Sequence, residues 1–331
     1  MSVDDLAIEM HSAPEPGLSM SMAEMAYHET LSEGGNTYDV GTVVTDFDAD
    51  FDGTTSDLLD DAKGLIQKII MGTAVEGEVA MGELHYTRYD MDSAAVTREA
   101  STGGITLKVR LAIPEFSIKM DLNSFAYKDG SRDISCLPIK YDFWVGIDPS
   151  IDIGSITGLK SFLKALRLRS VAEITAEDGY TFTIDEGRAF MALLSTEGLR
   201  VICGDDTLTF QSTAVFWLRS GDDVVVSYHR LTADEIKEKV PKSVRERLNG
   251  GEVIELTNSA GIEELQGEVK ISVKTDLDPD GAEAYRIDTD RNKLVKEDSS
   301  ADGGYVEFRT DTMGLHAVSG PLTEPDRTAL A

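Results

Sequence analysis

The stretch Ile105-Thr-Leu-Lys-Val-Arg-Leu-Ala-Ile113 has an apolar residue at every second position. Successive side chains of a β-strand point to opposite faces of a sheet, so this alternation predicts a strand with one apolar and one polar face. The same pattern recurs on both sides, at residues 38–51, 75–89, 116–122 and 139–145. The sequence therefore predicts a mainly β fold that begins with antiparallel sheet.

One segment of the first half follows a helical period instead. Its apolar residues recur every three or four positions and fall on one helical face: Leu58, Leu59, Ala62, Leu65, Ile66, Ile69 and Ile70. Thr55 or Ser56 is a suitable N-cap and Gly72 a suitable stop. We expect an amphipathic helix over residues 56–71 that packs on the sheet.

The chain is long enough for two packed domains, because its 331 residues exceed the usual size of a single hydrophobic core. Pattern and composition divide it into a flexible N-terminal arm (1–36), a β-rich domain with one or two helices (37–156), a basic connector helix (157–170), a β-sandwich module (171–320) and a C-terminal tail (321–331). The arm is interpreted either as a disordered tail or as a segment that packs against another copy. The connector is expected between the domains, with a membrane surface or a partner as the alternative contact.

Short strands and turns alternate through the second half. Strand patterns cover residues 171–174, 180–184, 199–202, 208–210, 224–228, 253–257, 269–273, 284–288 and 305–309. A short helix follows Asp185, and a charged, helix-like stretch covers residues 232–247. Turn sequences at 278–281 and 299–304 separate the later strands. This density of strands predicts a sandwich of two sheets.

The end of the second half carries an ordered set of short matches to a known kind of module. The matching residues are Tyr285, Asp288, Lys293-Leu294-Val295, Gly304-Tyr305-Val306-Glu307-Phe308-Arg309-Thr310-Asp311 and Ala317-Val318. With them, residues 171–320 resemble the Ig-like β-sandwich modules of bacterial and archaeal surface-layer and adhesin-like proteins. The chain departs from that pattern at Thr312-Met313-Gly314 and at His316. The resemblance implies a load-bearing or displaying role and supplies no catalytic residues.

The charge of the chain limits its partners. It holds 60 acidic and 31 basic residues, a formal net charge of -29. A field of this sign repels nucleic acid and anionic lipid and attracts cations. We expect no nucleic-acid partner, and a fold that salt or calcium stabilises.

Two further features bear on where the protein works. No run of 18 apolar residues occurs, which predicts no transmembrane segment, and residues 1–25 lack the basic and apolar regions of a signal peptide. We expect an extracellular or cell-envelope protein whose leader is not in this numbering, with an intracellular protein as the alternative. Cys136 and Cys203 are expected to be free buried thiols; a disulfide between them is the alternative in an oxidising compartment.

Catalytic signatures are missing from the sequence. It contains no phosphate-binding glycine loop, no GxSxG and no HExxH, and its five histidines are scattered singly. Two aspartate ladders match the first half of a calcium loop: Asp48, Asp50 and Asp52, and Asp276, Asp278 and Asp280. Both lack the closing glutamate, so a looser Ca²⁺ site or a solvated acidic turn are the two interpretations.

These observations favour a non-enzymatic envelope or surface-layer-like structural protein that acts through self-association or binding to other envelope proteins. A subunit of a virion or a filament is one alternative. A ligand-binding module with an apolar pocket between the helix at 56–71 and the strands at 105–122 is another.

Overall fold

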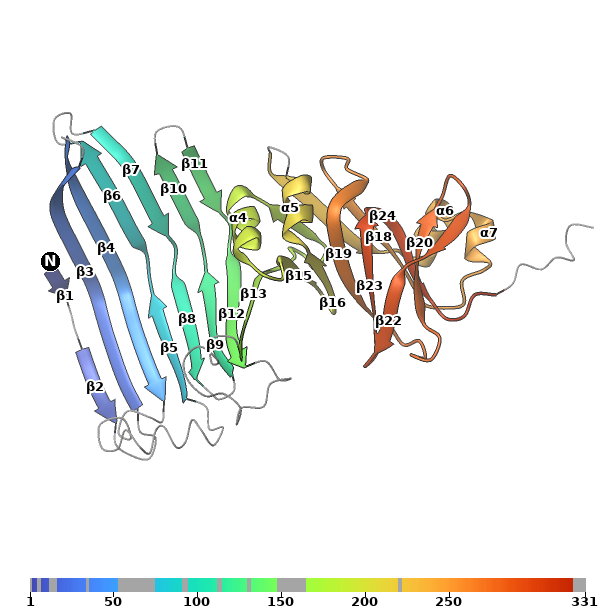
Figure 1. Ribbon diagram of the computed structural model, residues 1–331, viewed down its shortest axis with the longest axis horizontal. Coiled ribbons are helices and arrows are strands. Elements are labelled where there is room, and N and C mark those ends of the chain that lie inside the picture. Colours follow the sequence, from blue (N-terminus) through green and yellow to red (C-terminus); the bar gives the residue numbers. More distant parts are fainter. Residues whose placement is uncertain are drawn as a thin grey trace, which may run out of the picture. The chain divides into compact units, whose positions relative to one another are not determined.

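A computed structural model describes residues 2–4, 7–11, 17–33, 36–52, 75–90, 95–111, 115–129, 132–147, 165–219 and 222–323. It confirms a mainly β fold with antiparallel sheets. The chain divides into two compact units, Met1–Ala172 with Glu186–Arg188, and Glu173–Asp185 with Ala189–Ala331. Figure 1 labels most of the helices and strands of both.

The first unit is one antiparallel sheet. Its strands are β1 (Ser2–Asp4), β2 (Ala7–His11), β3 (Gly17–Glu33), β4 (Asn36–Asp52), β5 (Val75–Met81), β6 (Leu84–Asp90), β7 (Ala95–Thr102), β8 (Ile105–Leu111), β9 (Glu115–Leu122), β10 (Phe125–Asp129), β11 (Arg132–Cys136), β12 (Ile139–Ile147) and the start of β13 (Leu166–Thr175). β3 and β4 form one long hairpin. The later segments form four further long strands of a meander. Each long strand consists of two consecutive segments: β5 and β6, β7 and β8, β9 and β10, or β11 and β12.

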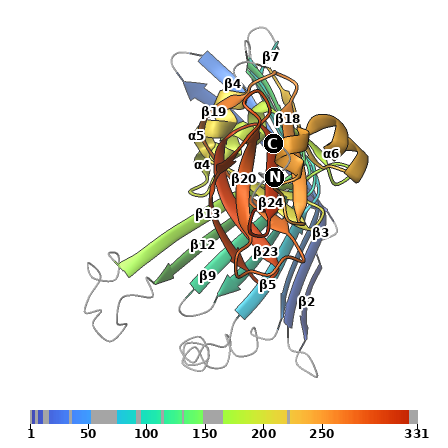
Figure 2. The same cartoon turned by 90° about the vertical axis from the view of Figure 1, so that its right-hand side faces the viewer.

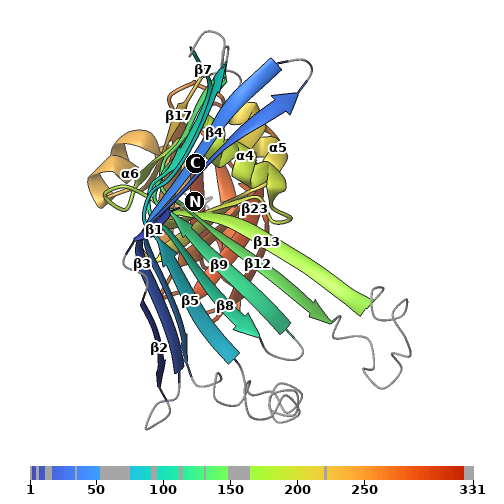
Figure 3. The same ribbon diagram turned by 90° about the vertical axis from the view of Figure 1, so that its left-hand side faces the viewer.

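These four long strands are all interrupted at the same level of the sheet. Met81, Ile105, Leu122 and Ile139 lie opposite one another in the last row before the interruption. Leu84, Thr102, Phe125 and Cys136 form the first row after it. In a regular strand, one residue separates two neighbouring side chains on the same face. Here two residues separate the two rows in each strand. Because of this extra residue, the apolar positions change between odd and even residue numbers within each of the four strands. Figure 3 shows that the sheet turns at this level.

The Gly103-Gly104 pair lets two neighbouring strands lie close together at this interruption. Gly103 N–H donates to the Ser124 carbonyl at 3.0 Å, and Asn123 N–H donates to the Gly104 carbonyl at 3.0 Å. A Cβ on Gly103 would meet the Ser124 hydroxyl at 2.6 Å. Two glycines therefore let the neighbouring backbone approach closely where the regular ladder stops.

The structure corrects two predictions for the first half. Residues 17–33 of the expected flexible arm form β3, which pairs with β4 of the same chain from Gly17–Asp52 to Glu33–Asn36. The expected basic helix is wrong for residues 166–170, which begin β13; β-branched and buried residues continue this strand to Thr175. Residues 157–164 and the helix expected at 56–71 lie outside the described residues.

The second unit is a sandwich of two sheets. Its helices are α4 (Glu186–Leu194), whose first three residues belong to the first unit, α5 (Ser212–Leu218), α6 (Ala233–Lys239) and α7 (Lys242–Arg245). Its strands are β14 (Thr181–Ile184), β15 (Leu199–Cys203), β16 (Asp206–Phe210), β17 (Val224–Arg230), β18 (Glu252–Asn258), β19 (Glu264–Lys274), β20 (Glu283–Asp288), β21 (Lys293–Lys296), β22 (Asp298–Asp302), β23 (Tyr305–Thr312) and β24 (Gly314–Ser319). One sheet has the order β14-β17-β18-β24-β20-β21, and the other contains β15-β16-β19-β23-β22.

Aromatic contacts show that the two sheets share one core. Phe182 of β14 packs edge-on against Phe210 of β16, with ring centroids 5.8 Å apart. Phe308 of β23 and His316 of β24 are 5.6 Å apart at another point between the sheets. All four side chains are almost completely buried, which is typical of the inner faces of a sandwich. Figure 2 labels β18, β20 and β24 of one sheet and β19 and β23 of the other.

Three details of the second unit differ from the sequence prediction. The polar stretch at 298–302, expected as part of a turn, is strand β22, and residues 212–218 form helix α5. The expected helix at 232–247 is two helices, because Pro241 cannot donate the backbone hydrogen bond that would continue α6. Thr232 caps α6 in a capping box with Glu235. Residues 324–331 of the expected tail lie outside the described part.

Candidate functional site

An apolar face covers most of the four long strands in the first unit. The rows opposite one another contain Val79, Leu107, Met120 and Tyr141; Met81, Ile105, Leu122 and Ile139; Val109, Ile118 and Phe143; and, beyond the interruption, Ala100, Tyr127 and Ile134. Of these side chains only Ile139 is buried, and the others are half-buried. We call this surface the apolar sheet face.

Little of the described chain covers this face. Among the residues of the first unit that the structure describes, the buried apolar ones are Cys136, Ile139, Ala165, Val171 and Ala172, whereas the second unit has a full core. At Cys136, Gly187 of α4 packs so closely that a Cβ there would overlap the cysteine. Arg188 holds this corner by donating to the Pro138 carbonyl at 2.9 Å. The rest of the face is one side of a sheet without a described second layer.

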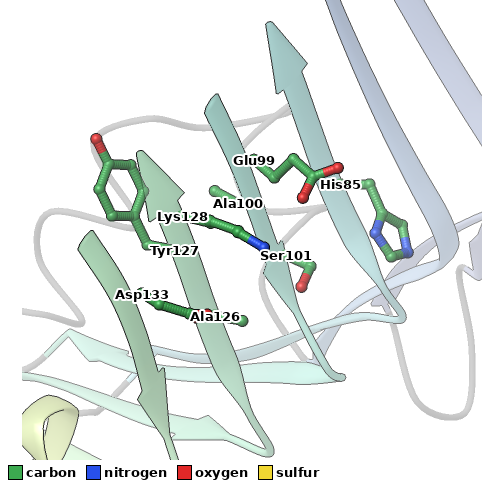
Figure 4. Close-up of a pocket in the computed structure, with 8 residues that line it drawn as sticks. All are labelled: His85, Glu99, Ala100, Ser101, Ala126, Tyr127, Lys128 and Asp133. Atoms are coloured by element: carbon green, nitrogen blue, oxygen red, sulfur yellow. The ribbon is translucent and has the colours of Figure 1, made fainter. Parts of the chain in front are cut away.

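The opposite face of the same sheet is polar. Glu99, Lys128 and Asp133 lie directly across neighbouring strands, so their charges alternate in sign. With His85 and Ser101 they line an open hollow of about 360 Å³ on β6, β7, β10 and β11 (Figure 4). A ligand pocket is usually enclosed and mostly apolar, and this hollow is neither. It is therefore not the apolar pocket that a ligand-binding first domain was expected to have.

One corner of this hollow holds the residue types of a hydrolytic site. His85 Nε2 lies 2.9 Å from Glu83 Oε2, and Ser101 lies directly opposite His85 in the register. Nucleophilic catalysis requires a hydrogen bond between the nucleophile and its base, and none joins Ser101 to His85 among the described contacts. Both His85 and Glu83 are also at least half exposed. We interpret them as polar residues on the solvated side of the sheet.

The most buried charged group of the second unit is Asp206, whose side chain is 2% exposed. It accepts hydrogen bonds from the Tyr228 hydroxyl at 2.7 Å, from Arg230 Nε at 2.6 Å and from the Lys274 backbone N–H at 2.8 Å. Burial, followed by the Asp206 charge, raises the pKa of Tyr228, and the hydrogen bond to Asp206 raises the pKa of Arg230. Because Asp206 belongs to one sheet and Tyr228 and Arg230 to the other, these hydrogen bonds link the two sheets of the sandwich.

Both cysteines are free and buried, as the sequence predicts. Burial and the nearby Asp206 carboxylate raise the pKa of Cys203 to about 12, so its reactive thiolate form is disfavoured. The two thiols form no disulfide in this structure, and Cys203 is a core residue.

The two aspartate ladders occupy different settings. Asp48, Asp50 and Asp52 are alternate residues of β4, and the register places Asp50 opposite Glu78 and Asp52 opposite Glu76. Asp276, Asp278 and Asp280 lie in the turn before β20, where Asp278 accepts the Asp280 backbone N–H at 3.0 Å. Within the described ranges no three metal-ligating side chains come together. The calcium interpretation stays a prediction for both ladders.

The second unit exposes large apolar side chains on two neighbouring helices. Phe190, Leu193 and Leu194 of α4 are 55%, 54% and 54% exposed, and Phe216 and Trp217 of α5 are 45% and 41% exposed. The helices lie side by side (Figure 1), and Ser212 at the start of α5 donates to the Ala192 carbonyl of α4 at 2.7 Å. We call these five residues the α4–α5 surface. The sequence pattern missed it, because the expected helix was assigned no exposed apolar side and α5 was not predicted.

A groove of about 740 Å³ lies at one end of the sandwich, between the β18–β19 loop, the β20–β21 turn and the start of β24. Its wall carries both charges, including Glu263, Asp288, Asp290, Arg286 and Arg291. Arg291 lies 3.9 Å from Asp288, so part of this charge is already paired. The groove offers no concentrated field of one sign that would select a charged ligand.

Comparison with protein-family models, curated proteins and solved structures gives no match for this chain. The functional argument therefore rests on the residues themselves. No helix in the described part of the chain is long and apolar enough to cross a membrane.

Proposed function

We propose that this protein is a non-enzymatic structural component that works by self-association, with the apolar sheet face as its main contact. The observation that carries the proposal is the face itself: rows of half-buried apolar side chains on a sheet with no described second layer. A sheet with one apolar face is stable when that face is covered, and two such sheets packed face to face form a sandwich. A second copy of the chain supplies a matching face.

The size of the face suits a stable contact between copies. Phe116 and Val145 add a fifth row to the face, and Leu84, Phe125 and Cys136 add a sixth. Four strands at about 4.8 Å spacing and six rows at about 6.6 Å give a surface of roughly 760 Å². A standard protein–protein interface buries about 800 Å² on each partner. The face is therefore large enough to hold a dimer without help from other parts of the chain.

The edge strands β21 and β22 of the sandwich are charged, which favours assembly through sheet faces over assembly by pairing of edge strands. The edge strand β21 carries Lys293 and Lys296, and β22 carries Asp298 and Asp302. Charged residues on edge strands oppose the addition of another strand. An envelope or surface-layer-like role fits this picture and the resemblance of residues 171–320, and an extracellular location is proposed on the same ground.

The test compares paired substitutions on the two sides of the same two strands. Val109 and Ile118 lie opposite each other on the apolar sheet face, and Lys108 and Lys119 lie opposite each other on the polar side. We expect the wild-type mass in light scattering to rise above 36.0 kDa with concentration, in about 0.5 M salt to screen the net charge of -29. Val109→Asn with Ile118→Asn should weaken association at least tenfold, whereas Lys108→Asn with Lys119→Asn should leave it unchanged.

Circular dichroism establishes that both variants are folded. Wild-type protein that stays monomeric at high concentration overturns the proposal. Equal association by the two paired variants also overturns it.

A further inference from the structure

The α4–α5 surface lies on the second unit and is separate from the face used in the proposed function. We propose that it is a second contact between copies of this chain, which joins dimers into larger assemblies. This inference rests on the proposed function, because it concerns what a dimer does next.

The exposure of this surface is not a by-product of folding. Helix α5 already packs on β19 through its buried residues Ala214, Val215 and Leu218. Trp217 is 41% exposed although its indole N–H donates to the Glu264 carbonyl at 2.9 Å. The indole is thus held in place with its apolar ring facing outward, which is the arrangement found at protein contacts.

The size of the surface fits a weak contact. With about 200 Å² for each full side chain, the five residues expose roughly 500 Å². Exposed apolar patches of this size mark interaction sites on soluble proteins. Two copies meeting here would bury roughly 1,000 Å² in total, which belongs to the weak class of interfaces. Such a contact acts best when another contact already holds the partners together.

Charge favours a second copy as the occupant. Residues 189–196 and 211–218 contain no charged side chain, in a chain with 60 acidic residues. Like charges keep copies of this protein apart over most of the surface, and the repulsion is smallest at an uncharged patch. A basic partner would bind the acidic surface instead, so an uncharged apolar patch is best matched by the same patch on another copy.

Two different contacts on one chain have a geometric consequence. If the apolar sheet faces pair two copies, each dimer still presents two α4–α5 surfaces. Pairing of those surfaces between dimers need not close, and it then produces strings or arrays. A dimer with a blocked α4–α5 surface cannot grow.

The experiment replaces exposed residues, so that the fold is preserved. Phe190→Gln with Leu193→Gln removes two side chains of the α4–α5 surface. Val225→Gln with Val295→Gln is the control, since these residues are 44% and 38% exposed on strands of the same unit. Analytical ultracentrifugation of the full chain at about 0.5 M salt gives the distribution of species.

We expect wild-type protein and the Val225/Val295 control to form species larger than a dimer as concentration rises. The Phe190/Leu193 variant should stop at the dimer. Wild-type protein that stops at the dimer, or a Phe190/Leu193 variant that grows as wild type does, overturns the inference and leaves the proposed function standing. The Val109/Ile118 variant tests the proposed function separately, because it should lose the dimer itself.

Discussion

The buried carboxylate of Asp206 should contribute far more to the stability of the second unit than its neighbour Asp205. Asp205 also forms an ion pair, with Lys274 Nζ at 2.9 Å, but its side chain is 70% exposed. Asp206→Asn keeps the size of the side chain and removes its charge, and it turns amide donors toward the donors of Arg230. Breaking a buried ion pair costs about 3–5 kcal/mol. Because the Arg230 side chain is 30% exposed and water can reach it, we expect the lower end, about 3 kcal/mol.

Urea unfolding of the full chain measures this difference. The chain has two tryptophans, so Trp144→Phe leaves Trp217 as the fluorescence probe of the second unit. With a slope of about 2–3 kcal/mol per molar urea, the midpoint of Asp206→Asn should fall by about 1–1.5 M. Asp205→Asn is the matched control, and its free energy of unfolding should change by less than about 0.5 kcal/mol. A loss below about 1 kcal/mol for Asp206→Asn, or equal losses for the two variants, would refute the reasoning.

Two further predictions concern the same unit and the same probe. Gly251 has φ +84° and a Cβ there would overlap the Val318 carbonyl oxygen, whereas Gly204 has φ +62° and open space around it. Gly251→Ala should therefore destabilise the unit by more than about 3 kcal/mol, and Gly204→Ala by only about 1–2 kcal/mol. Similar losses for the two variants in urea unfolding would contradict this prediction. Burial lowers the pKa of His316 from 6.5 to about 4, so between these values the unfolded chain binds the extra proton, and the free energy of unfolding should drop by up to about 1.4 kcal/mol per pH unit as the pH falls through this window. His316→Phe should remove that part of the pH dependence, and an unchanged slope in the variant would count against it.

Local patterns were sufficient to predict much of the fold. The alternation at residues 105–111 and 116–122 predicted β8 and β9, and the short strands after Leu199 predicted most of the sandwich. The helix after Asp185 is confirmed as α4. In each case the residues of one segment contain the whole signal, because the side chains of a strand or a helix alternate between a buried and an exposed side.

The missed elements depend on partners that are distant in the sequence. β22 is Asp-Ser-Ser-Ala-Asp, a composition typical of turns, and it is a strand because it pairs with β23. Gly17–Glu33 has no sustained alternation, yet it pairs along its length with β4. Pairing satisfies the backbone whatever the side chains are, and so a sequence pattern does not reveal it.

The candidate surfaces were predicted only in part. The apolar sheet face follows from the alternation of its strands, but the sequence did not indicate that the described chain leaves it largely uncovered. The α4–α5 surface was missed altogether, because an apolar residue on a short helix has the same appearance in a sequence whether it is buried or exposed. The sequence does not distinguish Asp206 from the other acidic residues, 60 in all, because its three hydrogen-bond partners are evident only in the structure.

The shared interruption of the four long strands limits how this sheet can change during evolution. A one-residue deletion between Met81 and Leu84 would shift the half of this strand that begins at Leu84 by one residue against its neighbours, so the apolar side chains of that half would point to the wrong side. The neighbouring strands would keep the extra residue, so the rows would no longer match. Insertions and deletions at this level are therefore tolerated only when several strands change together, whereas the loops at the strand ends can vary one at a time.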